Sequence, residues 1–280
     1  MINVLVTGAG GQLGKTIKAL FSKNNYNLNV VFVTKEELDI TNSESTHAFF
    51  LNNKFDYCIN CAAYTNVEQA EKTPEIAFKV NAEGVKYLAK SCKTSDTILI
   101  HISTDYVFDG EKSEPYTVDD IPNPINEYGK SKLKGEQYIQ ELLKSYFIVR
   151  TSWLYSKKHG HNFYKTILEK TKMKAELSVA TDQIGCPTKA NDLAKFLIKI
   201  ITVSSASYGI YHYCNKGMTS WYGFANEICK LTKTNTIIIP ILSRNLKTIA
   251  VRPKYSALCH KKATKQFYLE IPEWKESLKH

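Results

Sequence analysis

A tyrosine and a lysine stand four residues apart in Tyr128-Gly129-Lys130-Ser131-Lys132. On a helix, residues at this spacing share one face, so their side chains are neighbours. A tyrosine phenol has an ordinary pKa of about 10 and is a poor acid–base group at neutral pH, whereas a nearby ammonium lowers that pKa. The pair therefore predicts a proton-transfer site, although the same spacing is also common on solvated helices.

A second motif could bind phosphate, because Gly8, Gly11 and Gly14 follow a short apolar run and open a helical pattern. The first glycine permits a tight turn, and the second lets backbone N–H groups approach a pyrophosphate. The third lets the helix pack closely on the strand, while the helix N-terminus attracts the anion. A glycine-rich turn alone is weak evidence, but the strand–turn–helix context predicts dinucleotide binding.

A hydroxyl at the end of another apolar run is a third candidate for the site, beside the tyrosine–lysine pair and the glycine loop. Thr104 follows the predicted strand Thr97–Ser103 and could hydrogen-bond a substrate carbonyl, although it or Ser103 could equally be an ordinary loop residue. We expect this strand to be the fourth of a parallel sheet and to lie next to the first across the switch point. The end of this strand, with Thr104, would then lie beside the glycine loop.

The elements that must position these residues alternate between β-branched apolar runs and amphipathic stretches, as in a parallel sheet with crossover helices. This alternation predicts an α/β fold, a Rossmann-type doubly wound parallel sheet. The predicted strands are Asn3–Thr7, Asn29–Val33, Tyr57–Asn60, Thr97–Ser103 and Tyr146–Thr151, and the predicted helices between them are Gln12–Ser22, Ser43–Asn52, Pro74–Cys92 and Glu127–Lys144.

The pattern changes after Thr151, where Gly, Pro and aromatic residues become common and helices such as Asn191–Val203 and Ser220–Thr232 stand apart. We expect a dinucleotide-binding domain over residues 1–152. Residues 153–280 would form mostly a smaller substrate-binding lobe, with a segment at about 184–203 returning to pack on the sheet. Ligands of open α/β folds bind at the carboxyl edge of the strands, which this lobe would cover.

Composition narrows the class of protein. The 280 residues carry 37 Lys+Arg against 27 Asp+Glu, a formal charge of +10, but the basic residues are scattered and no nucleic-acid-binding signature accompanies them. No apolar run approaches the roughly 18–20 residues that span a bilayer, and no signal peptide is visible, so we expect a cytoplasmic protein without a nucleic-acid or membrane partner. The odd set of seven cysteines indicates reduced thiols, and Cys58 and Cys61 are predicted to be ordinary core residues.

The glycine spacing, Thr104 and the Tyr128–Lys132 pair together resemble the extended short-chain dehydrogenase/reductase family. Over nearly the whole length, the chain is similar to the dTDP-4-dehydrorhamnose reductases within that family. Further blocks that carry the resemblance are Asn60–Thr65, Ser103–Phe108, Arg150–Tyr155, Asp182–Thr188, Thr219–Trp221 and Arg252–Ser256.

The resemblance implies that Thr104, Tyr128 and Lys132 are catalytic, and that Thr104, Asp105 and Trp153 meet the sugar, unless Trp153 packs in the core. It implies NADPH- or NADH-dependent reduction of the C4 ketone of a nucleotide-linked 4-dehydro-6-deoxy sugar, which would feed polysaccharide or glycan synthesis. The implied cofactor residues are Gly8, Gly11, Gln12, Leu13 and Gly14 at the pyrophosphate, Asp39 and Ile40 at the adenine end, and Ala62, Ala63, Tyr64, Thr65, Tyr128 and Lys132 near the nicotinamide ribose.

The end of the second predicted strand bears on the choice of cofactor. NAD-specific folds place an acidic residue there for the ribose 2′-hydroxyl. This chain offers Thr34 and Lys35 instead, which favours NADPH with NADH also usable, although Glu36 could still turn inward.

Two alternatives stay open: a reductase of another UDP- or dTDP-linked 4-ketosugar, and a non-catalytic NADP-binding regulatory subunit. A 4,6-dehydratase is disfavoured, because Tyr106 follows Asp105 where such relatives carry an Asp-Glu pair. Some relatives form homodimers that hold magnesium at their interface, but no ligand cluster here demands a metal. His159 and His161 are predicted to lie in a flexible surface loop.

Overall fold

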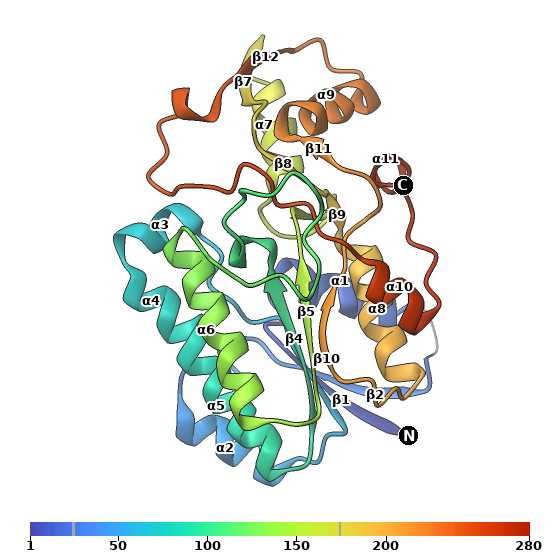
Figure 1. The fold of residues 1–280 in the computed structure, drawn as a ribbon. Helices are drawn as coiled ribbons and strands as arrows, with labels where there is room; N and C mark the ends of the chain where they lie inside the picture. The colour runs from blue at the N-terminus through green and yellow to red at the C-terminus, as the bar shows by residue number, and fades with distance from the viewer. Residues whose placement is uncertain (24–25, 174) are drawn as a thin grey trace.

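A parallel sheet of six strands forms the centre of the computed structural model, which describes residues 1–23, 26–173 and 175–280 (Figure 1). The strand order is β10-β5-β4-β3-β1-β2, and the predicted α/β doubly wound fold is confirmed. The strands of this sheet are β1 (Ile2–Thr7), β2 (Leu28–Phe32), β3 (Tyr57–Asn60), β4 (Ile98–Thr104), β5 (Tyr146–Thr151) and β10 (Gly209–His212).

Helices cover both faces of the sheet, as Figure 1 shows. Helices α1 (Gln12–Phe21) and α8 (Ala190–Thr202) pack together on one face, while α2 (Ser43–Asn52), α5 (Val85–Thr94) and α6 (Glu127–Leu142) cover the other. Because successive strand residues point to opposite faces, Val4 and Val6 join the core beneath α1 and α8, whereas Leu5 joins the core beneath α5 and α6. The central strands are buried on both sides and are mainly apolar, although β4 and β5 also bury the polar side chains of His101, Ser103 and Arg150.

The prediction that β4 lies next to β1 was wrong. β4 pairs with β3, and β3 pairs with β1, so the strand order reverses between β1 and β3. The reason is that the chain after β2 adds no further strand on that side within the described residues, but enters α2 and crosses β1 directly. The glycine loop after β1 therefore faces the segment that follows β3.

The predicted helix Pro74–Cys92 is interrupted. It divides into α4 (Pro74–Phe78), the π-helix η1 (Lys79–Gly84) and α5, and the short α3 (Val67–Lys72) precedes it. A π-helix has wider turns than an α-helix and is frequent at functional sites. Here it carries the buried side chain of Asn81 toward α6 and toward the loop after β3.

The second half of the chain supplies both a small lobe and further layers of the sheet domain. In the lobe, β7 (Glu176–Ala180) pairs with β12 (Ile237–Ile241), and α7 (Phe163–Thr171) packs on α9 (Trp221–Thr232). Strand β10, which sequence patterns did not reveal, pairs with β5. The remaining elements are β6 (Leu154–Tyr155), β8 (Ile184–Gly185), β9 (Thr188–Lys189), β11 (Thr219–Ser220), α10 (Lys261–Phe267), α11 (Trp274–Lys279) and the 3-10 turns η2 (Asp105–Val107) and η3 (Ser243–Asn245).

Membrane crossing can be judged over the described ranges, 1–23, 26–173 and 175–280. None of their helices has the length and apolar character needed to span a bilayer.

Candidate active site

A cavity of about 400 Å³ lies at the carboxyl edge of the sheet, between the sheet domain and the small lobe. This is where open α/β folds bind their ligands. The structure gathers predicted site residues from five separate segments around it, namely Gly11, Gln12, Leu13, Ala63, Thr65, Thr104, Asp105, Tyr128, Lys132 and Trp153.

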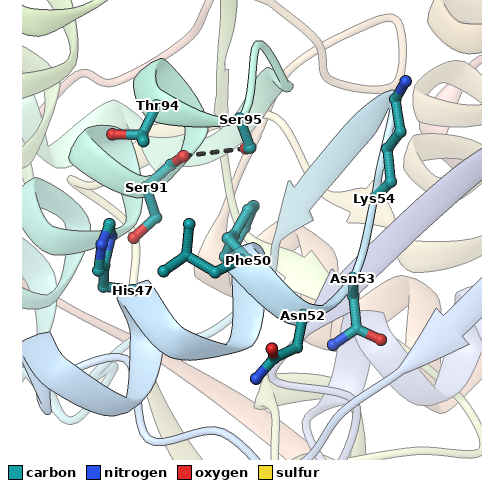
Figure 2. A pocket seen from close by; sticks show the side chains of 9 residues that line it. His47, Phe50, Asn52, Asn53, Lys54, Ser91, Thr94 and Ser95 are labelled. Atoms are coloured by element: carbon teal, nitrogen blue, oxygen red, sulfur yellow. Dashed lines mark hydrogen bonds between the residues drawn. The ribbon is translucent and has the colours of Figure 1, made fainter.

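A second hollow, of similar size, lies away from these residues. Figure 2 shows it between α2 and α5, where it is lined by His47, Phe50, Leu51, Asn52, Asn53, Lys54, Ser91, Thr94 and Ser95. Lys54 precedes β3 and Ser95 precedes β4, so this hollow lies at the amino edge of the sheet. None of the predicted site residues reaches it, and we place the active site at the carboxyl edge.

The glycine loop can accept a pyrophosphate. Gly8 has φ +64°, and a β-carbon there would lie 2.5 Å from the backbone nitrogen of Ala62, so only glycine fits. A β-carbon at Gly10 would contact only the Thr34 methyl carbon, at 3.9 Å, and one at Gly11 would contact only the Gly8 backbone oxygen, at 3.3 Å. Among the described residues no side chain caps α1, so its first N–H groups remain available to an anion. The loop therefore fits an NADP-type dinucleotide.

Other predicted cofactor residues lie around this loop. Asn81 of η1 holds the backbone of Tyr64 through two hydrogen bonds of 2.9 Å, which fixes the segment after β3. The Asp39 carboxylate accepts hydrogen bonds from Thr41, and Ile40 is buried. Lys35 is exposed on the turn after β2, so its contact with the cofactor stays a prediction.

Tyr128 is brought to Thr104 by the start of α6. Asn126 caps this helix by accepting a hydrogen bond of 2.8 Å from the backbone nitrogen of Gly129. A β-carbon at Gly129 would clash with the backbone oxygen of Tyr106, so glycine lets the helix approach the end of β4. Burial raises the pKa of Tyr128 to about 12, and hydrogen bonding with Thr104 only partly offsets this rise.

This raised pKa of Tyr128 is the opposite of the lowered pKa that we predicted from the nearby Lys132. The ammonium nitrogen of Lys132 instead donates a 2.6 Å hydrogen bond to the carbonyl of Ile102 and lies 3.2 Å from His101 Nε2. Burial lowers the pKa of Lys132 itself to about 8, against the opposing effects of Glu136 and Cys61. Tyr128 therefore carries its proton at neutral pH, as a proton donor must.

Thr104 and Asp105 form a buried hydrogen-bonded unit. The Thr104 hydroxyl donates to Asp105 Oδ1 over 3.0 Å, and the Ser152 hydroxyl donates to Oδ2 over 3.1 Å. Burial raises the pKa of Asp105 to about 6, although hydrogen bonds from Ser256, Thr104 and Ser152 oppose the rise. Among the described ion pairs none includes this carboxylate, and its oxygens accept hydrogen bonds from these three hydroxyls and from the Asp105 backbone nitrogen.

Trp153 lines the cavity, and its indole stacks on that of Trp221 with ring centroids 3.5 Å apart. Its backbone has φ +47°, which is rare for a bulky residue and typical of functional sites. A β-carbon at Gly185 would lie 2.5 Å from the indole, so glycine makes room for it. The ring therefore lies at the cavity wall and also packs against the hydrophobic core of the small lobe, and its contact with the sugar stays a prediction.

Several residues that line the cavity were not predicted. Thr151 ends β5, and its buried hydroxyl has no hydrogen-bond partner within the described chain. Its position at a strand end, level with Thr104, was the signal that could have found it. His161 and Asn162 also line the cavity from the loop that we predicted at the surface. Asn162 donates to Gln12 Oε1 over 2.6 Å and so joins the small lobe to the phosphate loop.

A buried ion pair supports the floor of the site. The Arg150 guanidinium donates to both oxygens of Glu136, and the Ser103 hydroxyl donates to Glu136 Oε1 over 2.5 Å. Both charged side chains are almost completely inaccessible, at 2 % and 0 % exposure. The network ties β4, β5 and α6 together one helical turn beyond Lys132.

Metal binding was assessed over the same described ranges. They contain no cluster of three or more His, Cys, Asp or Glu side chains suited to hold a metal ion.

Comparison with known proteins agrees with this geometry. The family model of the RmlD substrate binding domain matches residues 2–280. A dTDP-4-dehydrorhamnose reductase from Aggregatibacter actinomycetemcomitans is 39 % identical over 100 % of this chain and 98 % of its own. The spore coat polysaccharide biosynthesis protein SpsK from Bacillus subtilis (strain 168) is 38 % identical, over 100 % and 96 %.

A solved structure extends the comparison to three dimensions. The dTDP-4-dehydrorhamnose reductase from Bacillus anthracis str. Ames in complex with NADP has a TM-score of 0.94 at 40 % identity, covering 99 % of this chain and 98 % of that one. Sequence and fold thus agree with these relatives along nearly the whole length of the chain. The chain belongs to the RmlD substrate binding domain family, which includes the dTDP-4-dehydrorhamnose reductases.

Proposed function

We propose that this chain is an NADPH-dependent oxidoreductase that reduces the C4 ketone of dTDP-4-dehydro-L-rhamnose, in the cytoplasm, to supply dTDP-L-rhamnose for polysaccharide synthesis. The observation that carries the proposal is the convergence of Thr104, Tyr128 and Lys132 beside the glycine loop in one cavity. Relatives at 38–39 % identity include a dTDP-4-dehydrorhamnose reductase and a polysaccharide biosynthesis protein, and a relative of nearly the same fold is solved with NADP.

The cofactor would supply the hydride for the reduction, and the protein would supply the proton. When bound, NADPH supplies a hydride, and Gly11, Gln12 and Leu13 would hold its pyrophosphate. Tyr128 then gives its proton to the oxygen that was the ketone, and Thr104 positions that oxygen. General acid catalysis of this kind typically contributes ~10²–10⁴-fold. Lys132 sits one helical turn further along α6 and returns a proton toward Tyr128.

A neighbouring hollow of about 420 Å³ suits the nucleotide end of the substrate. It shares the lining residues His161, Asn162 and Trp221 with the cavity, so the two lie side by side. Lys170 and Arg252 line it and would attract the diphosphate. The sugar would then lie between Trp153 and Tyr128.

Replacing Trp153 with alanine should raise the ketosugar KM by roughly 10- to 100-fold, because aromatic burial of a deoxysugar is worth up to a few kcal/mol. The NADPH dissociation constant should stay nearly unchanged. Steady-state kinetics and fluorescence titration measure the two quantities. The matched control is Trp274→Ala, which truncates a core tryptophan of 5 % exposure and should lower the melting temperature without raising KM. An unchanged KM in Trp153→Ala would place the sugar elsewhere.

Replacing Lys35 with glutamate should weaken NADPH binding roughly tenfold and leave NADH binding almost unaffected, because only NADPH carries a 2′-phosphate for the ammonium. Calorimetric titration with each cofactor tests this. Lys54→Glu, an exposed charge reversal at the amino edge of the sheet, is the control. Equal weakening of both cofactors would remove Lys35 from the 2′-phosphate site.

The deciding experiment is a competition assay in which NADPH oxidation is followed by absorbance. The purified chain is offered dTDP-linked and UDP-linked 4-dehydro-6-deoxy sugars separately and together. We expect turnover of the dTDP-linked sugar with a kcat/KM at least tenfold above that of the UDP-linked one. Preference for the UDP-linked sugar would replace the proposed substrate, and absence of turnover with either would favour a regulatory role.

A further inference from the structure

His101 is a histidine that neither the proposed chemistry nor the sequence motifs use, yet it touches the catalytic lysine. It lies on β4 with 0 % of its side chain exposed. Its Nδ1 is 3.0 Å from Asn60 Nδ2, and its Nε2 is 3.2 Å from Lys132 Nζ. Both ring nitrogens are therefore engaged, one on each side.

The orientation of Asn60 decides which nitrogen of His101 carries the proton. Asn60 Oδ1 accepts hydrogen bonds from the Thr7 hydroxyl over 2.8 Å and from the Ala62 backbone nitrogen over 3.1 Å. The amide nitrogen is therefore the atom that faces His101, and it can only donate. His101 Nδ1 must accept, so the neutral imidazole carries its hydrogen on Nε2.

This hydrogen points at Lys132. An ammonium nitrogen has no lone pair, so it cannot accept from Nε2–H, whereas a neutral amine can. The imidazole is itself neutral, because burial and then the nearby lysine hold the pKa of His101 well below its ordinary range. The contact is consequently a hydrogen bond only when Lys132 has given up a proton.

We propose that His101 is a positioning residue for the catalytic lysine: oriented by Asn60, its Nε2–H stabilises the neutral amine of Lys132 and so makes release of the lysine proton part of each turnover. The inference deepens the proposed function and rests on it. The other titratable groups that act on Lys132 are Glu136 on its own helix and Cys61 after β3, and the Glu136 charge is itself held by Arg150 of β5.

The proton balance is simple. Tyr128 gives its proton to the alkoxide oxygen of the substrate and becomes a phenolate. A proton from the Lys132 ammonium restores the phenol, leaving a neutral amine that accepts the hydrogen bond from His101. Water then returns a proton to Lys132, and His101 keeps its own hydrogen throughout.

The first test reads the tautomer directly, without substrate. Nitrogen-15 NMR of the ring-labelled protein should show His101 neutral from pH 6 to 9 with its hydrogen on Nε2. The variant Asn60→Asp presents only acceptor oxygens to Nδ1 and should move the hydrogen to that atom. His47, an exposed histidine on α2, gives a solvent-accessible reference signal in the same spectra and is the internal control. A hydrogen on Nδ1 in the unaltered protein, or a charged imidazole, would overturn the proposal.

The second test measures kcat against pH for two substitutions at residue 101. His101→Phe removes the donor, so Lys132 should hold its proton to higher pH and the alkaline fall of kcat should move up by roughly half a unit to one unit. His101→Gln keeps both an acceptor for Asn60 and an N–H for Lys132, and its alkaline fall should stay near that of the unaltered protein.

A purely structural histidine gives a different result. If His101 is only structural, both variants should lower the melting temperature, or lower kcat at every pH, without moving the pH at which kcat falls on the alkaline side. This outcome would overturn the proposal. If no ketosugar is turned over, the proposed function fails, while the NMR measurement still decides the tautomer of His101.

Discussion

Tyr128→Phe should lower kcat by about 10²–10⁴-fold, the largest effect on catalysis that we expect from a single substitution. The phenol is the proton donor of the cavity, and burial keeps its proton in place at neutral pH. Phenylalanine retains the ring and its edge-on contact with Tyr106, so the fold and the cofactor site should survive. Single-turnover measurement of NADPH oxidation isolates the chemical step.

The control for this variant is Tyr138→Phe. Tyr138 lies on the same helix, but its hydroxyl donates to Glu83 on the outer face, away from the cavity. Its removal should leave kcat within a factor of about two, since the loss of a surface hydrogen bond has small effects. Turnover by Tyr128→Phe that matches this control would disprove the assignment of Tyr128.

Arg150→Met should destabilise the protein by about 3–5 kcal/mol, because it leaves the buried Glu136 carboxylate without its partner. For a chain of this size the loss corresponds to a fall in melting temperature of roughly 10 °C. Differential scanning calorimetry at neutral pH measures it. The double variant Glu136→Gln/Arg150→Met removes both charges and should recover much of the lost stability.

An exposed ion pair provides the comparison for this effect. Lys279 and Glu276 lie 2.6 Å apart on α11 with about half of each side chain exposed. Lys279→Met should change stability by less than about 1 kcal/mol, as is usual for surface pairs. If Arg150→Met proves as mild as Lys279→Met, the buried pair does not hold β4, β5 and α6 together.

The sequence was sufficient for the parts of the site that depend on local spacing. Gly8, Gly11 and Gly14 sit at a strand-to-helix turn, and Tyr128 and Lys132 share a helical face, because both relations follow from the geometry of single elements. The central strands of the first half were also predictable, since their burial on both faces leaves mainly apolar runs.

Relations between distant segments were not predictable in the same way. The placement of β4 beside β3 depends on which side of β1 the chain returns to, and the residues of the strands themselves do not encode that choice. The contact of His101 with Asn60 joins two neighbouring strands at one register, and only the paired sheet reveals it. Likewise, η1 lies where the Asn81 side chain hydrogen-bonds with the backbone of Tyr64 and the hydroxyl of Ser131. These contacts join segments that are distant in the sequence, so helix patterns alone do not predict the interruption.

The stacked pair Trp153 and Trp221 has an optical consequence. Two indoles whose centroids are 3.5 Å apart and whose planes differ by 5° share their electronic excitation, so they absorb and emit as a coupled unit. The third tryptophan, Trp274, instead packs against Phe224 in the core of the lobe and emits independently. Near-ultraviolet circular dichroism and intrinsic fluorescence should therefore contain a signal from the cavity wall itself. A sugar that enters beside Trp153 would change this signal without any attached label, and its arrival could be followed before chemistry begins.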